Sequence, residues 1–188
     1  MWRTIYVSER LAVSSSDHAA AESHYLRSSY RELLVEHLFV GSLLRHLWRN
    51  GVFDVEVLKS QVDDAGYDLV LESNGVIRHV QLKAKVEGST TSVPVNIRLA
   101  DEKRSGCVVA VVHDPTFDPG SFRYGWFGSP PGLPLPEAWK SLAVARHTKG
   151  NASGVKTERP NIRKLPYSKF LERGLRLDEL AERLFGKR

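Results

Sequence analysis

Three polar side chains fall on a predicted β-hairpin, and their types suit metal-assisted cleavage of a phosphodiester. Asn74-Gly75 separates two runs of alternating apolar residues, which is the strongest short-range hairpin signal in a sequence. If these two residues form the turn, the pairing places Asp68 opposite Gln81, with Lys83 on the same face two residues later. We therefore expect a carboxylate, an amide and an ammonium group to meet in one cluster.

Each group in this cluster has a role that a hydrolytic metal site needs. Mg²⁺ takes oxygen ligands and keeps several of its waters. Asp68 would supply a carboxylate, Gln81 a side-chain carbonyl oxygen and Leu82 its backbone carbonyl. Lys83 would stabilise the charge that develops on the phosphate, or position the attacking water. An ordinary solvated hairpin with its polar groups facing outward is the competing interpretation.

Hydrophobic periodicity predicts the elements that must position these groups. Leu33, Leu34, Leu38, Leu43, Leu44 and Leu47 predict a helix over residues 23–50, ending at Gly51. On the hairpin, the core-facing side is expected to hold Tyr67, Leu69, Leu71, Val80 and Leu82. Strands are predicted at residues 52–58, 67–72, 76–84, 107–113 and 121–127, with a helix at 94–105.

The C-terminal third differs in composition from the part before it. Residues 130–136 form a Pro-rich connector, and residues 140–164 read as a basic loop with seven Lys or Arg against one Glu. Residues 175–185 predict an amphipathic helix with Leu177, Leu180, Ala181 and Leu184 on its apolar face. We expect a single domain over residues 1–188, with a core at about 23–127 and an extension at 128–188.

The hairpin segment resembles the PD-(D/E)xK nuclease superfamily. Asp68 matches the first acid of the motif, Gln81 the variable second position and Lys83 the lysine. The resemblance implies an α/β fold with a restriction-endonuclease-like core, a mixed β-sheet flanked by helices in the order αβββαβ, here with a C-terminal helical extension. It also implies a Mg²⁺- or Mn²⁺-dependent endonuclease that hydrolyses nucleic acid, with DNA as the expected substrate.

One residue departs from the family's usual pattern. Gln81 stands where a second acid is common; the resemblance implies that glutamine is tolerated in branches such as the Mrr-like restriction enzymes, or that it marks a weaker site or a lost activity. Family members often recruit a glutamate from the preceding helix. Glu36 is the candidate and Glu32, its i−4 neighbour, the alternative; simple solvation of either residue is an equal interpretation.

Basic residues around the motif are candidates for contacts with nucleic-acid phosphates. The net charge of +5 suits a polyanionic partner. Near the motif and on the following segment these residues are Lys85, Arg98 and Lys103; in the basic loop they include Lys149 and Lys156. A plain charged surface loop is the alternative for the latter two.

Composition narrows the function classes. The single cysteine, Cys107, excludes an internal disulfide and argues against a zinc finger. The sequence has no apolar run long enough for a membrane helix and no recognisable secretory leader, so we expect a cytoplasmic protein. Two other functions stay open: an inactive nuclease-like module that binds nucleic acid or a protein partner, and a small assembly protein. A homodimer would suit cleavage of both strands.

Overall fold

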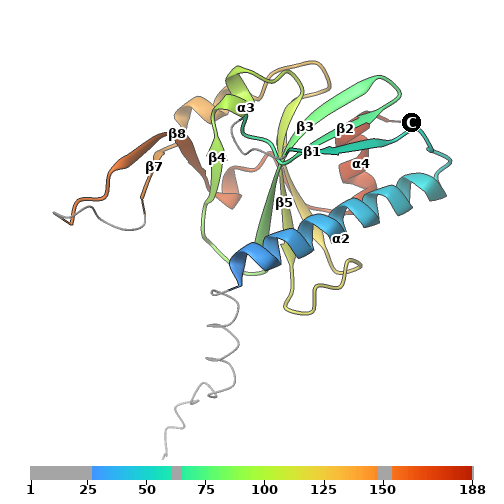
Figure 1. Cartoon of the computed structure of the whole chain (residues 1–188), viewed down its shortest axis with the longest axis horizontal. Coiled ribbons are helices and arrows are strands. Elements are labelled where there is room, and N and C mark those ends of the chain that lie inside the picture. Colours follow the sequence, from blue (N-terminus) through green and yellow to red (C-terminus); the bar gives the residue numbers. More distant parts are fainter. Residues whose placement is uncertain (1–26, 61–64, 148–153, 188) are drawn as a thin grey trace, which may run out of the picture.

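The computed structural model describes residues 27–60, 65–147 and 154–187. Its longest helix is α2 (Ser28–Arg49), which runs along the front of a mixed sheet in Figure 1. The predicted helix start at residues 23–26 lies outside the described residues. No helix in the described ranges is long and apolar enough to cross a membrane.

The main sheet has six strands in the order β1-β2-β3-β5-β6-β9. Only β3 and β5 pair in parallel, and the other neighbours are antiparallel, so the prediction of a mixed α/β sheet is confirmed. The strand bounds are β1 Glu56–Lys59, β2 Leu69–Ser73, β3 Val76–Val86, β5 Gly106–His113, β6 Arg123–Gly128 and β9 Glu172–Leu175.

The hairpin between β2 and β3 follows the predicted register. Asn74 and Gly75 have φ values of 50° and 74°. Two consecutive residues with positive φ are the mark of the type I′ turn that suits the twist of a hairpin. Ser73 pairs with Val76, and Val70 pairs with His79, as the turn position predicts.

Two helices cover one face of the main sheet, but α2 uses a different apolar stripe from the predicted one. Val35, Phe39, Leu43 and Leu47 are its buried residues, at a regular spacing of four. The predicted Leu33 and Leu44 are exposed, because they lie on the flanks of this stripe. The terminal helix, α4 (Leu177–Phe185), buries Leu180, Ala181 and Leu184 as expected.

The opposite face carries a second sheet that the sequence patterns do not predict. Its order is β4-β8-β7, with β4 Val93–Asn96, β8 Glu158–Leu165 and β7 Val144–Arg146. The helix predicted over 94–105 is wrong for its first part: Val93 and Val95 alternate inward as a strand, and only α3 (Arg98–Asp101) is helical. The loop predicted over 140–164 contains both β7 and β8, which project from the body (Figure 1).

A buried arginine joins the hairpin to the end of the chain. Arg78 of β3 has no exposed surface. Its guanidinium donates hydrogen bonds to the carbonyl oxygens of Leu184 (2.7 Å), Arg183 (2.7 Å) and Ser129 (2.8 Å). Two of these are C-terminal carbonyls of α4, which lack partners within the helix. Arg78 therefore caps α4 from within the sheet.

Candidate active site

A cavity of about 720 Å³ lies between the first turns of α2, the second half of β3 and the segment that leads into β4. Its lining contains most of the residues that the sequence proposed: Glu32, Glu36, Asp68, Leu82, Lys83 and Lys85. These residues come from a helix, from the residue before β2 and from β3. The cavity is therefore the candidate active site.

Asp68 sits where β2 and β3 begin to separate. The regular β2–β3 ladder starts one residue later, at Leu69 opposite Val80. The Asp68 backbone N–H donates to the Val80 carbonyl oxygen (2.9 Å), and its carboxylate Oδ2 accepts the Leu82 backbone N–H (2.6 Å). The carboxylate thus takes the place of a strand partner for β3 beyond the end of the ladder.

Gly66 explains how the chain reaches this position. Its φ is +77°, and a Cβ atom there would lie 3.0 Å from the Asn96 Cβ and 3.2 Å from the Leu99 backbone nitrogen. A side chain would be both strained and crowded. The turn also places Tyr67 against the second-sheet core rather than on the predicted face with Leu69.

The Leu82 carbonyl, a predicted metal ligand, points to the side of β3 on which the Asp68 carboxylate lies. In a β-strand the N–H and C=O of one residue point toward the same neighbour. Because the Leu82 N–H points at the Asp68 carboxylate, the Leu82 carbonyl points to the same side of β3. Its oxygen and the Asp68 carboxylate can therefore serve one ion.

Lys83 is the cation in this group that has no partner in the described part of the chain. It is half-buried and lines the cavity. Its ammonium makes no hydrogen bond or ion pair with any residue that the structure describes. It can therefore meet an anionic group that enters the cavity.

Gln81 is the predicted ligand that the structure places apart from this cavity. Its side chain is 4% exposed. The side-chain oxygen Oε1 accepts the Asn96 backbone N–H of β4 (3.2 Å), and Gln81 is absent from the cavity lining. An amide oxygen has a second lone pair, so this contact does not use its full acceptor capacity. In this arrangement Gln81 joins β3 to β4.

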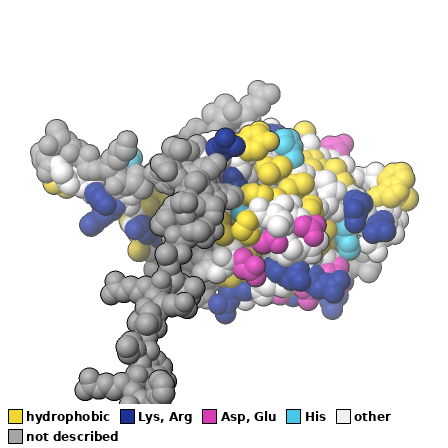
Figure 2. Space-filling model, turned by 90° about the horizontal axis from the view of Figure 1, so that it is seen from below, with side chains coloured by type: hydrophobic (Ala, Val, Ile, Leu, Met, Phe, Trp, Pro, Cys, Tyr) yellow, Lys and Arg dark blue, Asp and Glu magenta, His cyan; other side chains and the backbone are white. Residues whose placement is uncertain are grey.

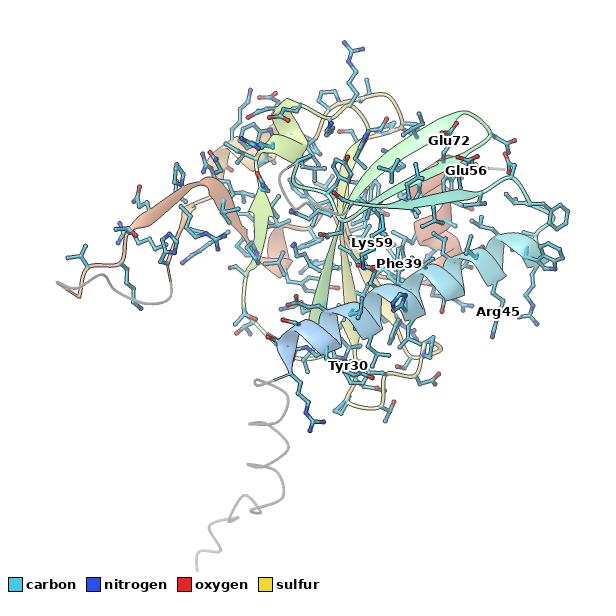
Figure 3. All side chains as sticks on the ribbon, in the orientation of Figure 1. Tyr30, Phe39, Arg45, Glu56, Lys59 and Glu72 are labelled. Atoms are coloured by element: carbon cyan, nitrogen blue, oxygen red, sulfur yellow. The ribbon has the colours of Figure 1, made fainter. Side chains whose placement is uncertain are left out.

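Glu36 lines the cavity but is held in an ion pair. Its Oε1 lies 2.5 Å from the Lys59 Nζ of β1, and the glutamate side chain is only 15% exposed. In Figure 3 Lys59 lies beside α2 near Phe39. Sequence patterns gave no sign of Lys59, because the contact joins residues 23 positions apart in different elements. Glu32 also lines the cavity and is exposed.

Lys85 is a buried cation at the inner end of the cavity. It is 5% exposed, its Nζ donates to the Thr91 carbonyl oxygen (3.0 Å), and it lies 5.5 Å from the centre of the Tyr167 ring. Burial lowers the pKa of the Lys85 ammonium. These contacts hold the Lys85 ammonium group inside the protein. They favour a structural role for Lys85 over the predicted contact with phosphate.

Of the other predicted nucleic-acid contacts, Arg98, Lys103 and Lys156 do not line the cavity. Lys103 stacks over the Tyr67 ring at 5.5 Å, and Arg98 forms an ion pair with Glu102 (3.7 Å). Lys156 is exposed beside β8, whereas Lys149 lies outside the described residues. Seen from below, basic and acidic side chains are intermixed around a hydrophobic area (Figure 2).

The donor set fits a hydrated, oxygen-seeking divalent ion better than a tightly caged one. Within the described ranges, no group of three or more His, Cys, Asp or Glu side chains could hold a metal ion. Asp68 and the Leu82 carbonyl would hold such an ion, since Mg²⁺ commonly uses one or two carboxylates and keeps its waters. No family model matches the chain, and no curated protein sequence matches it.

Proposed function

We propose that this protein is a metal-dependent endonuclease of the PD-(D/E)xK type that hydrolyses nucleic-acid phosphodiester bonds, with DNA as the expected substrate. A bound Mg²⁺ or Mn²⁺ would polarise the scissile phosphate and lower the pKa of a water. Asp68 and the Leu82 carbonyl would bind the ion, with Gln81 as a further predicted ligand. Lys83 would stabilise charge on the phosphate or orient the attacking water.

One observation carries this proposal. Asp68 and Lys83, which the sequence singled out by type and spacing, line one cavity together with an acid of the preceding helix, Glu36. The cavity has room for a phosphodiester. Lys83, which lines it, has no hydrogen-bond or ion-pair partner among the described residues. An ordinary solvated hairpin gives no reason for an acidic residue of the preceding helix to line the same cavity.

The projecting β7–β8 ribbon supports nucleic acid as the partner. Val93 and Pro94 of β4 line the cavity, and Pro94 pairs with Lys164 of β8. The ribbon therefore begins at the rim of the cavity. Its described basic residues are Arg146, Lys156, Arg159, Arg163 and Lys164, against the single acid Glu158. We place such a protein in the cytoplasm, and a homodimer would let two sites cut both strands.

Cleavage assays test the proposal directly. Supercoiled plasmid and single-stranded DNA are incubated with the wild type in Mg²⁺ or Mn²⁺, and in EDTA. We expect metal-dependent nicking or linearisation, and a loss of at least about 100-fold in rate for Lys83→Ala because the transition-state charge loses its cation. Gel electrophoresis over time gives the rates.

Lys169→Ala provides the matched control. Lys169 is exposed on the short 3₁₀ helix Tyr167–Lys169, far along the chain from the cavity residues, so its removal changes the net charge equally. Equal cleavage by the wild type and Lys83→Ala would show that the activity comes from another site or a contaminant. Thermal unfolding of both variants checks that the fold is kept.

A second candidate is an inactive nuclease-like module that binds nucleic acid or a protein partner. The Gln81 oxygen bonded to Asn96 and the Glu36–Lys59 ion pair favour it, because both reduce the acidic ligands on offer. Calorimetric titration with Mn²⁺ separates the two functions. The endonuclease is expected to bind Mn²⁺ in a manner that Asp68→Ala abolishes, whereas the inactive module shows no difference between the two proteins.

A further inference from the structure

A second cavity, the α2–α4 groove, lies on the other flank of α2 and has a volume of about 790 Å³. Its walls come from α2, the turn before β6, the start of β6 and the start of α4. Arg45 follows Glu36 by nine residues, which at about 100° per residue puts the two on opposite sides of the helix. In Figure 3 Arg45 extends below α2, whereas Lys59 lies above it.

Arginines outnumber acidic residues in the lining of the α2–α4 groove. It contains four arginines against two aspartates: Arg45, Arg49, Arg123, Arg176, Asp118 and Asp178. Both aspartates are engaged, since Asp118 accepts the Gly120 N–H (3.0 Å) and Asp178 pairs with Arg176 (3.5 Å). The groove therefore keeps a surplus of positive charge.

Two of these arginines have no competing partner among the described residues. Arg45 and Arg49 are exposed and make no hydrogen bond or ion pair with any residue in the described ranges. They lie one helical turn apart on α2, and both line the groove. A guanidinium group can donate two parallel hydrogen bonds to two oxygens of the same phosphate. A phosphate is therefore the anion that suits these arginines best.

The floor of the groove is apolar, and the hydroxyl of Tyr124, one of the lining residues, is buried rather than exposed to the groove. Leu38, Phe122 and Leu177 line it, with Phe122 2% exposed. Tyr124 is 1% exposed, and its hydroxyl is buried without a hydrogen-bond partner among the described residues.

We propose that the α2–α4 groove binds a nucleoside phosphate, with the phosphates on Arg45 and Arg49 and the base on the apolar floor formed by Leu38 and Leu177. The volume lies in the range of small-ligand sites, roughly 300–1,000 Å³. An apolar floor with a cationic rim matches a molecule that has one flat, weakly polar end and one anionic end. The proposal does not depend on the endonuclease, because none of the proposed metal ligands lines this groove.

Calorimetric titration of the full chain tests this site, with the four ribonucleoside diphosphates and inorganic pyrophosphate as probes. We expect saturable binding of at least one diphosphate, and weaker binding of pyrophosphate because it lacks a base. The Arg45→Glu/Arg49→Glu variant should lose at least tenfold in affinity.

The matched control is Lys169→Glu/Arg173→Glu, which changes the charge equally at exposed positions outside the groove. It should bind the diphosphate like the wild type. No saturable binding of any of the four diphosphates, pyrophosphate binding as tight as the best nucleotide, or equal losses in both double variants would overturn the proposal. Cleavage by the wild type would remain possible in each of these cases, so the two proposals fail separately.

Discussion

At the scale of single residues, Asp68 links local folding to the proposed chemistry. Its carboxylate accepts the Leu82 N–H at the point where β3 loses β2 as a partner. The same oxygen atoms are the ones that a metal would need. Asp68→Asn would keep an oxygen acceptor for the Leu82 N–H but lose the charge, so we expect this variant to lose metal binding without unfolding the protein.

Cys107 gives a residue-scale prediction about reactivity. The thiol is fully buried, and burial raises its pKa to about 12. Since only the thiolate is nucleophilic, the native protein at pH 8 should not react with a thiol reagent such as Ellman's reagent, and the denatured protein should react with one equivalent. Rapid labelling of the native protein would contradict the burial of this strand.

The same thiol also predicts a dependence of stability on pH. The folded protein holds the proton on Cys107, whereas the unfolded chain releases it near the ordinary pKa of 9.0. The unfolded state therefore binds fewer protons above that pH, and the contribution of Cys107 to stability falls as the pH rises from about 9 toward 12. Cys107→Ala should remove this part of the decline in denaturant titrations.

At the scale of elements, the attachment of α4 to β3 depends on Arg78. Burial lowers the pKa of its guanidinium, and the three carbonyl hydrogen bonds offset that cost. Arg78→Met should lower the free energy of unfolding by about 3 kcal/mol, because buried carbonyl oxygens lose their charged donor. Chemical denaturation measures the change, and Arg173→Met on the exposed part of β9 is the control. A loss below about 0.5 kcal/mol would show that water replaces the guanidinium readily.

The elements that could be predicted from the sequence are those set by neighbours along the chain. Asn74-Gly75 determined the hairpin register, and apolar periodicity indicated α2 and α4. The second sheet could not be predicted, because β4 and β7 are short and β4 pairs with β8 far away in the sequence. Burial against the main sheet stabilises β4, whereas most of β8 is exposed in the projecting ribbon.

The residues of the candidate site also fall into those that the sequence predicted and those that it did not. Asp68, Leu82 and Lys83 follow from the hairpin, so type and spacing sufficed to bring them to one cavity. The Lys59–Glu36 ion pair and the Gln81–Asn96 hydrogen bond depend on how β1 and β4 pack around that hairpin. No spacing rule relates those residues, and their partners became visible only with the tertiary structure.

At the scale of the whole molecule, the basic residues of the β7–β8 ribbon predict that binding of nucleic acid depends on salt concentration. Fluorescence anisotropy with labelled duplex DNA and no divalent metal should show affinity falling linearly on a log–log plot against salt. Arg159→Ala/Lys164→Ala should reduce the slope by about two, because two phosphates are no longer neutralised by the protein. Lys169→Ala should leave the slope unchanged. An unchanged slope for the double variant would place the nucleic acid elsewhere on the surface.

The hydrogen bonds of Arg78 have a consequence for the order in which the chain folds during its synthesis. Its two acceptors on α4 lie more than a hundred positions later, 105 and 106 residues along the chain. At ordinary translation rates of about 5–20 residues per second, the hairpin waits roughly 5–20 s before those carbonyls exist. During that interval water would have to satisfy the Arg78 guanidinium, so we expect this part of the sheet to stay solvated until α4 is made. Among the described helices, α4 is therefore the one expected to complete the burial of Arg78.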